Sequence, residues 1–120
     1  NNEKEFNDKN CIKVVCDKHW DAMFFSRQPI PYSKKITYPF LGKQVCVIPF
    51  KREFLSTYNS LEPTKYERSE SIDMLRVLEH GFNVRMVPTM EHSQAVDTLE
   101  DLILVEKILS KKQNINSNSP

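Results

Sequence analysis

The sequence contains only two glycines, Gly42 and Gly81, in 120 residues. Phosphate-binding loops of the two common types need several closely spaced glycines, so the chain contains neither type. The phosphates of any bound nucleotide would therefore be held mostly by residues outside this chain. Long hydrophobic runs are lacking too: no stretch approaches the ~20 apolar residues that span a bilayer, and none follows a charged start as in a secretory signal. We expect a soluble protein without membrane contacts.

The sequence also has no excess of charge of one sign. It contains 17 basic and 16 acidic residues, and the basic residues do not gather into one run, so nothing in the charge indicates a nucleic-acid partner. Cysteine is scarce: Cys11, Cys16 and Cys46 lie in hydrophobic strings, and their odd number is typical of reduced, buried thiols in a cytoplasmic protein. Cys11, Cys16 and His19 lack the second Cys/His pair that a zinc site needs.

The first half of the chain is predicted to contain three strands. Residues 11–16 and 22–26 are rich in β-branched, apolar and aromatic residues, and the polar residues 17–21 separate them. This pattern predicts two antiparallel strands joined by a turn. The two prolines within residues 28–32 remove backbone donors, so a rigid extended loop should follow. The apolar string at residues 43–50 predicts a central strand buried on both faces.

The second half is predicted to contain three helices and one strand, from the spacing of its apolar residues. Ser69 or Ser71 can cap the second helix, and Gly81 can end it. Thr98 and Asp101 match a capping box at the start of the third helix. The first helix is expected at residues 51–58, the third at residues 99–112 and the strand at residues 82–88.

This order of elements predicts an α/β fold with a mixed sheet. Residues 1–10 and 111–120 are polar, so we expect a flexible lead-in and a disordered tail around one domain at residues 11–110. No Ser or Cys pairs with a histidine in a recognisable pattern, so no catalytic nucleophile is assigned.

Four strings occur in order along the chain: FFSRQPIPY at residues 24–32, GKQVCVIPF at 42–50, ESIDMLR at 70–76 and VDTLEDL at 96–102. Their order and spacing resemble the C-terminal half of the sugar-acid cytidylyltransferases, closest to the 3-deoxy-manno-octulosonate (KDO) cytidylyltransferase family. The resemblance implies the mixed-sheet half of a nucleotide-diphospho-sugar-transferase-like, Rossmann-like fold. The family's Arg/Lys loop for the CTP phosphates has no counterpart here, so we expect the C-terminal part of an enzyme that is inactive alone.

The resemblance also implies a function. These enzymes are CMP-sugar-acid synthetases, which join CTP to a 2-keto sugar acid such as KDO and release pyrophosphate, as in lipopolysaccharide biosynthesis. Mg²⁺ is the implied cofactor, and a homodimer and the N-terminal half of the same enzyme are the implied partners. Two alternatives stay open: a non-catalytic binding or assembly module with the same half-fold, and a cytidylyltransferase for another acid, such as a nonulosonic acid or a phosphonate.

Asp97 is the candidate metal ligand. It lies just before a predicted helix, and Mg²⁺ in nucleotide sites takes few protein carboxylates besides phosphate and water ligands. The resemblance assigns the metal-binding role to Asp97. The ordinary alternative is an acidic residue that stabilises a helix N-terminus.

Four residues are candidates for the sugar-acid pocket: Arg27, Gln44, Glu70 and Asp73. Arg27 precedes the proline-rich loop, where a guanidinium can bind a carboxylate through two hydrogen bonds. Glu70 can accept hydrogen bonds from sugar hydroxyls, and Asp73 can support it one turn later. The ordinary alternatives are a surface arginine and a helix-start acid. Arg76 is predicted to be a structural ion-pair partner.

The string at residues 42–50 departs from the family pattern. KDO enzymes typically have His-Ile-Gly-Ile-Tyr where this chain has residues 44–48, and a Gln is usual at the position of Met74. Gln44 forms hydrogen bonds but does not titrate near neutral pH, and Ile48 offers no side-chain hydrogen bond. We therefore expect either a related, less hydroxylated acid or a sugar that is held differently.

Overall fold

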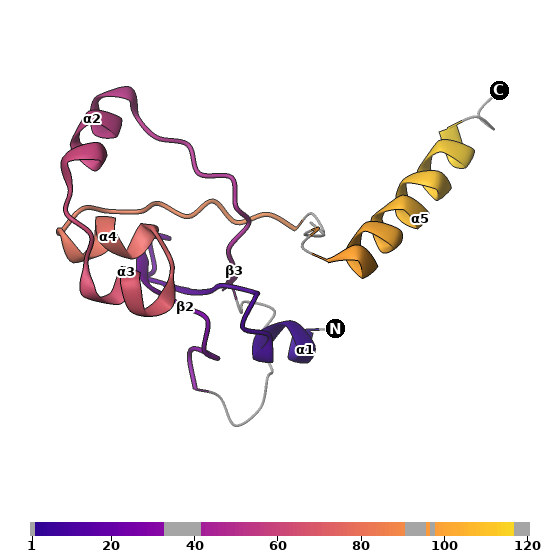
Figure 1. Cartoon of the computed structure of the whole chain (residues 1–120), viewed down its shortest axis with the longest axis horizontal. Coiled ribbons are helices and arrows are strands. Elements are labelled where there is room, and N and C mark those ends of the chain that lie inside the picture. The colour runs from indigo at the N-terminus through magenta and orange to yellow at the C-terminus, as the bar shows by residue number, and fades with distance from the viewer. Residues whose placement is uncertain (1, 33–41, 91–95, 97, 117–120) are drawn as a thin grey trace. The chain divides into compact units, whose positions relative to one another are not determined.

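The computed structural model of the protein describes residues 2–32, 42–90, 96 and 98–116 (Figure 1). The chain divides into two compact units, Asn1–Pro88 and Thr89–Pro120. No helix within the described residues is long and apolar enough to cross a membrane.

The sheet of the first unit has the strand order β2-β1-β3, and both strand pairs are antiparallel. Its strands are β1 (Lys13–Cys16), β2 (Ala22–Ser26) and β3 (Gly42–Lys43). Val14 pairs with Phe25 on one side and with Gly42 on the other. At the turn, the Asp17 carboxylate accepts hydrogen bonds from the backbone N–H groups of His19 and Asp21. The predicted hairpin is therefore confirmed.

The predicted central strand at residues 43–50 is wrong for most of its length. Pairing ends at Lys43, and beyond it the backbone N–H of Gln44 donates to the carbonyl of Ile12 at 2.9 Å. The residues that follow have no regular structure, and Val47 is 80% exposed. The apolar run indicates burial, but a strand buried on both faces needs neighbours that the described residues do not supply. For the same reason Cys46 is exposed, against expectation.

Five helices occur in the described residues: α1 (Asn2–Asn7), α2 (Arg52–Ser60), α3 (Lys65–Glu70), α4 (Met74–Glu79) and α5 (Leu99–Asn116). Helix α1 lies where we expected a flexible lead-in. The predictions of α2 and α5 are confirmed, and α5 extends to Asn116, beyond its predicted end. The capping box of α5 is also confirmed, since the Thr98 N–H donates to the Asp101 carboxylate at 3.0 Å and the Asp101 N–H donates to Thr98 Oγ1 at 3.2 Å.

The helix predicted between Ser69 and Gly81 is α4, which begins later than expected, at Met74, and an additional helix, α3, precedes it. Ser71 does not begin a helix but ends α3, in the left-handed conformation with φ 54°. Asp73 then precedes α4. Gly81 has φ 81° and follows α4, so the predicted stop is confirmed. Sequence spacing missed α3 because its residues, KYERSE, are almost all polar.

The strand predicted at residues 82–88 is reduced to a single bridge between Arg85 and Asp21. The Ala22 N–H donates to the Val84 carbonyl at 2.9 Å, and the Met86 N–H donates to the Trp20 carbonyl at 2.8 Å. The segment thus runs beside the hairpin turn without forming a full strand.

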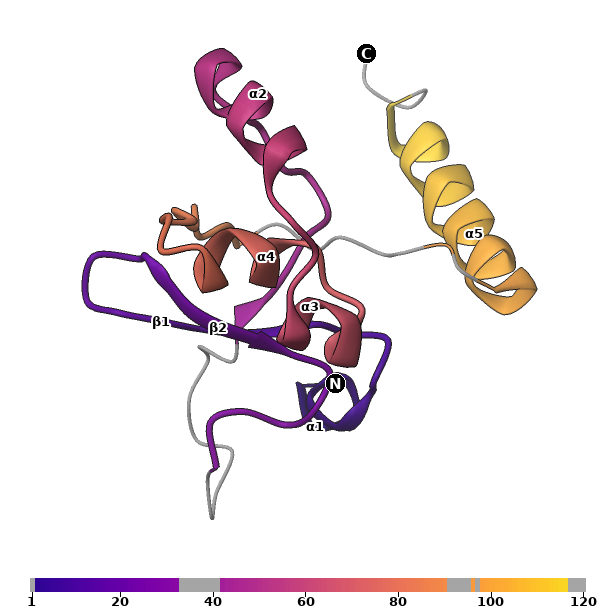
Figure 2. The same ribbon diagram turned by 60° about the vertical axis from the view of Figure 1, so that its left-hand side comes forward.

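The core of the first unit lies where α4 meets the hairpin (Figure 2). Its buried residues come from β1, β2, α4 and the residues before α4: Val14, Ala22, Phe25, Ile72, Met74, Leu75 and Val77. This packing fixes the position of α4, and α4 in turn forms one wall of the site described next.

Candidate functional site

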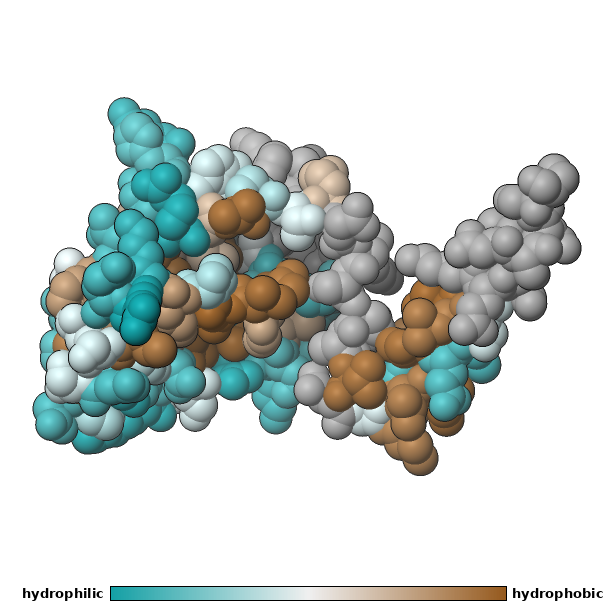
Figure 3. Space-filling view, turned by 90° about the horizontal axis from the view of Figure 1, so that it is seen from above, coloured by the Kyte–Doolittle hydropathy of each residue, from teal (hydrophilic) through white to brown (hydrophobic). Residues whose placement is uncertain are grey.

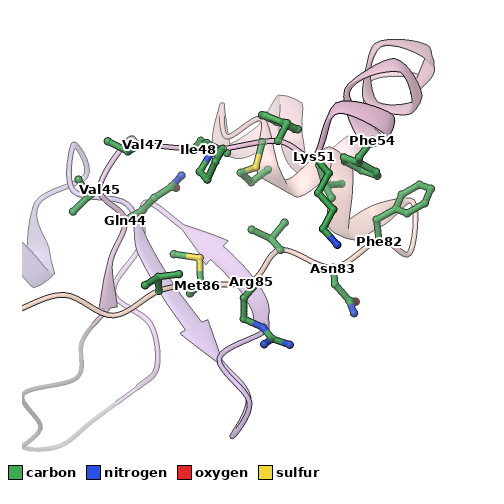
Figure 4. Close-up of a pocket in the computed structure, with 16 residues that line it drawn as sticks. Gln44, Val45, Val47, Ile48, Lys51, Phe54, Phe82, Asn83, Arg85 and Met86 are labelled. Carbon is green, nitrogen blue, oxygen red and sulfur yellow. The ribbon is translucent and has the colours of Figure 1, made fainter.

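A pocket of about 690 Å³ lies in the first unit, between residues 44–51 and residues 82–87 (Figure 4). Met74 and Val77 of α4 and Phe54 of α2 complete its lining. Most lining side chains are apolar, and apolar surface forms a band across this unit in the space-filling view (Figure 3). Such a concave, mostly apolar site with a few polar groups is the usual form of a small-molecule site.

The described lining of the pocket includes two cations, which differ in their partners. Arg85 Nε donates to Asp21 Oδ1 at 2.6 Å, and Arg85 Nη2 donates to Asp21 Oδ2 at 3.1 Å. This hydrogen-bonded pairing lowers the pKa of the Asp21 carboxyl. Lys51 has no ion pair among the described residues, and Figure 4 shows its side chain extending toward residues 82–87. Lys51 is therefore the pocket cation that a ligand can use.

Gln44 contributes a polar group to the pocket. Its Oε1 atom is buried and has no hydrogen-bond partner in the described part of the chain. A buried amide oxygen without a partner costs free energy, because water no longer solvates it. A ligand hydroxyl that reached this amide would relieve that cost.

The three departures from the family pattern meet in this pocket. Gln44 and Ile48 come from the string after β3, Met74 comes from α4, and all three line the same cavity. The two apolar departures, Ile48 and Met74, thus lie in one pocket.

Arg27 lies away from this lining and is held by backbone carbonyls. Its Nε donates to the Glu70 carbonyl at 2.7 Å, its Nη1 to the Lys9 carbonyl at 3.0 Å and its Nη2 to the Ser71 carbonyl at 3.2 Å. The guanidinium therefore ties the end of β2 to the end of α3. Its predicted role in binding the sugar acid stays a prediction.

Glu70 is at the end of α3 rather than at a helix start. Its carboxylate accepts hydrogen bonds from Ser26 Oγ at 2.8 Å and from the Arg27 N–H at 2.9 Å. The structure thus brings Glu70 and Arg27 together, but both are used in fixing the end of β2. The predicted contact of Glu70 with the sugar stays a prediction.

Lys13 supports the same region, and our reasoning from the sequence missed it. Its ammonium group donates to the carbonyls of Asp8, Cys11 and Arg27 at 2.6–2.7 Å. Burial lowers the pKa of Lys13. A lysine within an otherwise apolar strand was the available signal, since a buried charge needs such partners.

The structure says little about the two remaining predicted site residues, Asp73 and Asp97. Asp73 is exposed at the start of α4 and makes no side-chain capping bond. Asp97 lies outside the described residues. Within the described ranges, no group of three or more His, Cys, Asp or Glu residues could hold a metal ion. The metal role of Asp97 stays a prediction.

Comparison with known proteins identifies the family. A family model described as "Cytidylyltransferase" matches residues 1–101. The 3-deoxy-manno-octulosonate cytidylyltransferase of Chloroherpeton thalassium is 40% identical over 104 residues, which are 86% of this chain and 42% of that protein. The enzyme of the same name from Synechococcus elongatus is 39% identical over 82% of this chain and 41% of its own length. The chain thus spans less than half the length of these relatives.

A solved structure shows the same fold. It is a CMP:2-keto-3-deoxy-manno-octonic acid synthetase complexed with CTP, with a TM-score of 0.82 and 29% identity over 91% of this chain and 45% of that one. The predicted α/β, nucleotide-sugar-transferase-like fold is therefore confirmed. From its residues, its fold and the family model that covers most of its length, this chain belongs to the cytidylyltransferase family.

Proposed function

We propose that this chain is the C-terminal portion of a CMP-sugar-acid synthetase that converts CTP and a 2-keto sugar acid into the CMP-sugar and pyrophosphate. The observation that best supports the proposal is the likeness, at a TM-score of 0.82, to a synthetase solved with CTP. The pocket, to which two of the four family strings contribute lining residues, gives this proposal a place for the sugar acid.

In the proposed reaction, the anomeric hydroxyl of the sugar acid attacks the α-phosphorus of CTP. The new bond joins the anomeric oxygen to that phosphorus, the bond to the β-phosphate bridging oxygen breaks, and the hydroxyl proton is released. Gln44 would contact the sugar acid. Asp73, before α4 and outside the described pocket lining, would support its binding, and Arg27 and Glu70 would shape the site from the end of β2. Asp97 would hold Mg²⁺, because a carboxylate oxygen is a ligand that this ion prefers. Bound Mg²⁺ would neutralise phosphate charge.

The remainder of the enzyme is the first proposed partner, and without it we expect no activity. Exposed apolar side chains support the need for this partner: Val47, in the string after β3, is 80% exposed, and Val87, on the other side of the pocket, is 83% exposed. A strand-like apolar string of this kind is usually buried. The proposal also includes a homodimer, a cytoplasmic location and a role in lipopolysaccharide biosynthesis, as the resemblance implies.

Pyrophosphate release by the natural protein that contains this chain tests the proposal. The assay would contain CTP, Mg²⁺ and a panel of 2-keto sugar acids. We expect release with at least one acid, and we expect Asp97→Ala to lower it on the order of 100-fold or more, as the loss of an electrostatic catalytic contact does. Glu100→Gln, at an exposed neighbouring position, is the control and should keep activity. A folded protein that releases no pyrophosphate with any acid of the panel would favour a binding or assembly module.

A further inference from the structure

The pocket offers few hydrogen-bonding side chains for its size. Within its described lining, Gln44, Lys51, Asn83 and Arg85 are polar or charged, and Arg85 is already paired with Asp21. None of these described lining residues is a carboxylate. Every sugar hydroxyl that leaves water needs a new hydrogen-bond partner, and this described lining can supply few of them.

The apolar part of the lining is continuous. Met74 is 4% exposed and belongs to the core as well as to the pocket wall, so its position is fixed. Ile48, from residues 44–51, and Val77, from α4, line the same pocket. A hydroxyl against Met74 and Ile48 would lose its water partners without replacement, whereas a CH or CH₂ group there would be favourably buried.

The polar part of the lining can satisfy a carboxylate and one hydroxyl. Lys51 forms no ion pair within the part of the chain that the structure describes, so it is available to a carboxylate. Gln44 has a buried Oε1 without a partner, and an amide can accept one hydrogen bond from a hydroxyl while donating another.

We infer that this pocket selects a 2-keto sugar acid that lacks a hydroxyl on the face lying against Ile48 and Met74. Lys51 binds its carboxylate, and Gln44 binds one of its remaining hydroxyls. The inference rests on the proposed function, which it deepens by naming the substrate class and the residues that determine specificity.

Binding and turnover of deoxygenated acids test the inference. The natural protein that contains this chain would be given CTP and Mg²⁺ with 3-deoxy-manno-octulosonate, or with its analogues that lack the hydroxyl at C4, C5, C7 or C8. Affinity would be measured by calorimetry, and pyrophosphate release would give kcat/KM. We expect at least one analogue to exceed the parent acid in kcat/KM by about tenfold, a ratio typical of discrimination by one group in a pocket.

Variants assign the preference to residues. Ile48→Tyr and Met74→Gln each supply a hydrogen-bonding group, so each should shift the preference toward the parent acid by about tenfold. Met74→Leu keeps an apolar side chain of similar size and should keep the preference. Gln44→Leu should lower the affinity for every sugar acid by about tenfold while leaving the affinity for CTP unchanged. Because Met74 is buried, the Met74→Gln protein could fail to fold. In that case Ile48→Tyr alone tests the preference.

Two results would overturn the inference, and they are distinguishable. If the wild-type protein turns over the parent acid better than every analogue, the specificity inference fails and the proposed function stands. If no acid binds or reacts although CTP binds, the proposed function fails and the inference fails with it.

Discussion

Glu67 and Arg76 form a shielded ion pair between α3 and α4. Arg76 Nε donates to Glu67 Oε2 at 2.9 Å, and Arg76 Nη2 donates to Glu67 Oε1 at 2.5 Å. The backbone N–H of Thr64 donates to the same carboxylate at 3.0 Å. The hydrogen bonds from Arg76 are the largest cause of the lowered pKa of Glu67. The structural ion pair that the sequence predicted for Arg76 is therefore confirmed.

We expect this pair to make stability depend on pH. Because the pKa of Glu67 is lower in the folded than in the unfolded protein, the unfolded chain binds more protons between the two pKa values, and stability rises with pH there. The contribution is fully present above the ordinary glutamate pKa of about 4.3 and is lost as the pH falls through the folded value. Glu67→Gln should weaken this acid dependence and cost on the order of 2 kcal/mol at neutral pH.

Urea unfolding of the natural protein between about pH 3 and pH 7 measures both effects. The control is Glu53→Gln, which changes an exposed carboxylate on α2 and should leave the pH profile unchanged. An acid dependence as steep in the Glu67→Gln protein as in the wild type would contradict the prediction.

Arg27 and Glu70 show that the role of a side chain depends both on its residue type and on the partners that it meets in the fold. The sequence placed Arg27 and Glu70 in a sugar pocket, because their side chains can bind carboxylates and hydroxyls. In the structure they contact each other across 43 positions of sequence, with Arg27 Nε donating to the Glu70 carbonyl. Residue type indicates which bonds a side chain can make, whereas distant packing decides which partners it meets.

A glycine with a left-handed backbone follows α4, two residues after its last residue, Glu79. Gly81 has φ 81°, and the N–H groups of Gly81 and Phe82 donate to the carbonyls of Leu78 and Val77 at 2.9 and 3.1 Å. A Cβ at Gly81 would meet no atom within 4 Å. Any cost of a substitution therefore comes from the backbone conformation and not from a steric clash.

Gly81→Ala should lower the free energy of unfolding by about 1 kcal/mol, because a side chain disfavours the left-handed region. Gly81→Asn should cost less, since asparagine tolerates this conformation better. Thermal unfolding of the three proteins side by side measures the order. Equal or higher stability of the alanine variant would show that the backbone at this position relaxes.

The string at residues 43–50 shows the limit of pattern reasoning for an element. Its apolar content predicted burial on both faces, yet regular pairing ends at Lys43 and Val47 is exposed. Strand formation depends on a neighbouring strand, which apolar content alone does not supply. The hairpin of β1 and β2 could be predicted because its partner strand lies only a few residues away.

For the whole molecule, the exposed apolar side chains around the pocket predict a difference between this chain and the complete enzyme. Val45 and Val47 are exposed here, and under the proposed function the rest of the enzyme covers them. Backbone amides of residues 45–48 should therefore exchange hydrogen at least about tenfold more slowly in the complete enzyme than in the 120-residue chain.

Hydrogen exchange read by mass spectrometry compares the two proteins. Amides of residues 24 and 25 in β2, which the β1–β2 pairing already includes, serve as the internal control and should change less. Equal exchange at residues 45–48 in both proteins would contradict the proposed partner.

Features that depend on near neighbours followed from the sequence alone. The β1–β2 hairpin, the stop at Gly81 and the capping box of Thr98 and Asp101 each depend on short-range steric and hydrogen-bonding preferences. The order of the four strings was sufficient to indicate the family, since it needs no three-dimensional information.

The pocket and its chemistry depended on tertiary packing. Gln44, Ile48 and Met74 belong to separate segments, and only the packing of α4 against the hairpin brings the last of them to the cavity that the first two line. The sequence could name these three departures but not which pocket cation is left without an ion pair among the described residues, because tertiary packing pairs Arg85 with Asp21 and gives Lys51 no such partner. Contacts between distant residues follow from the arrangement of the whole core, which no local pattern encodes.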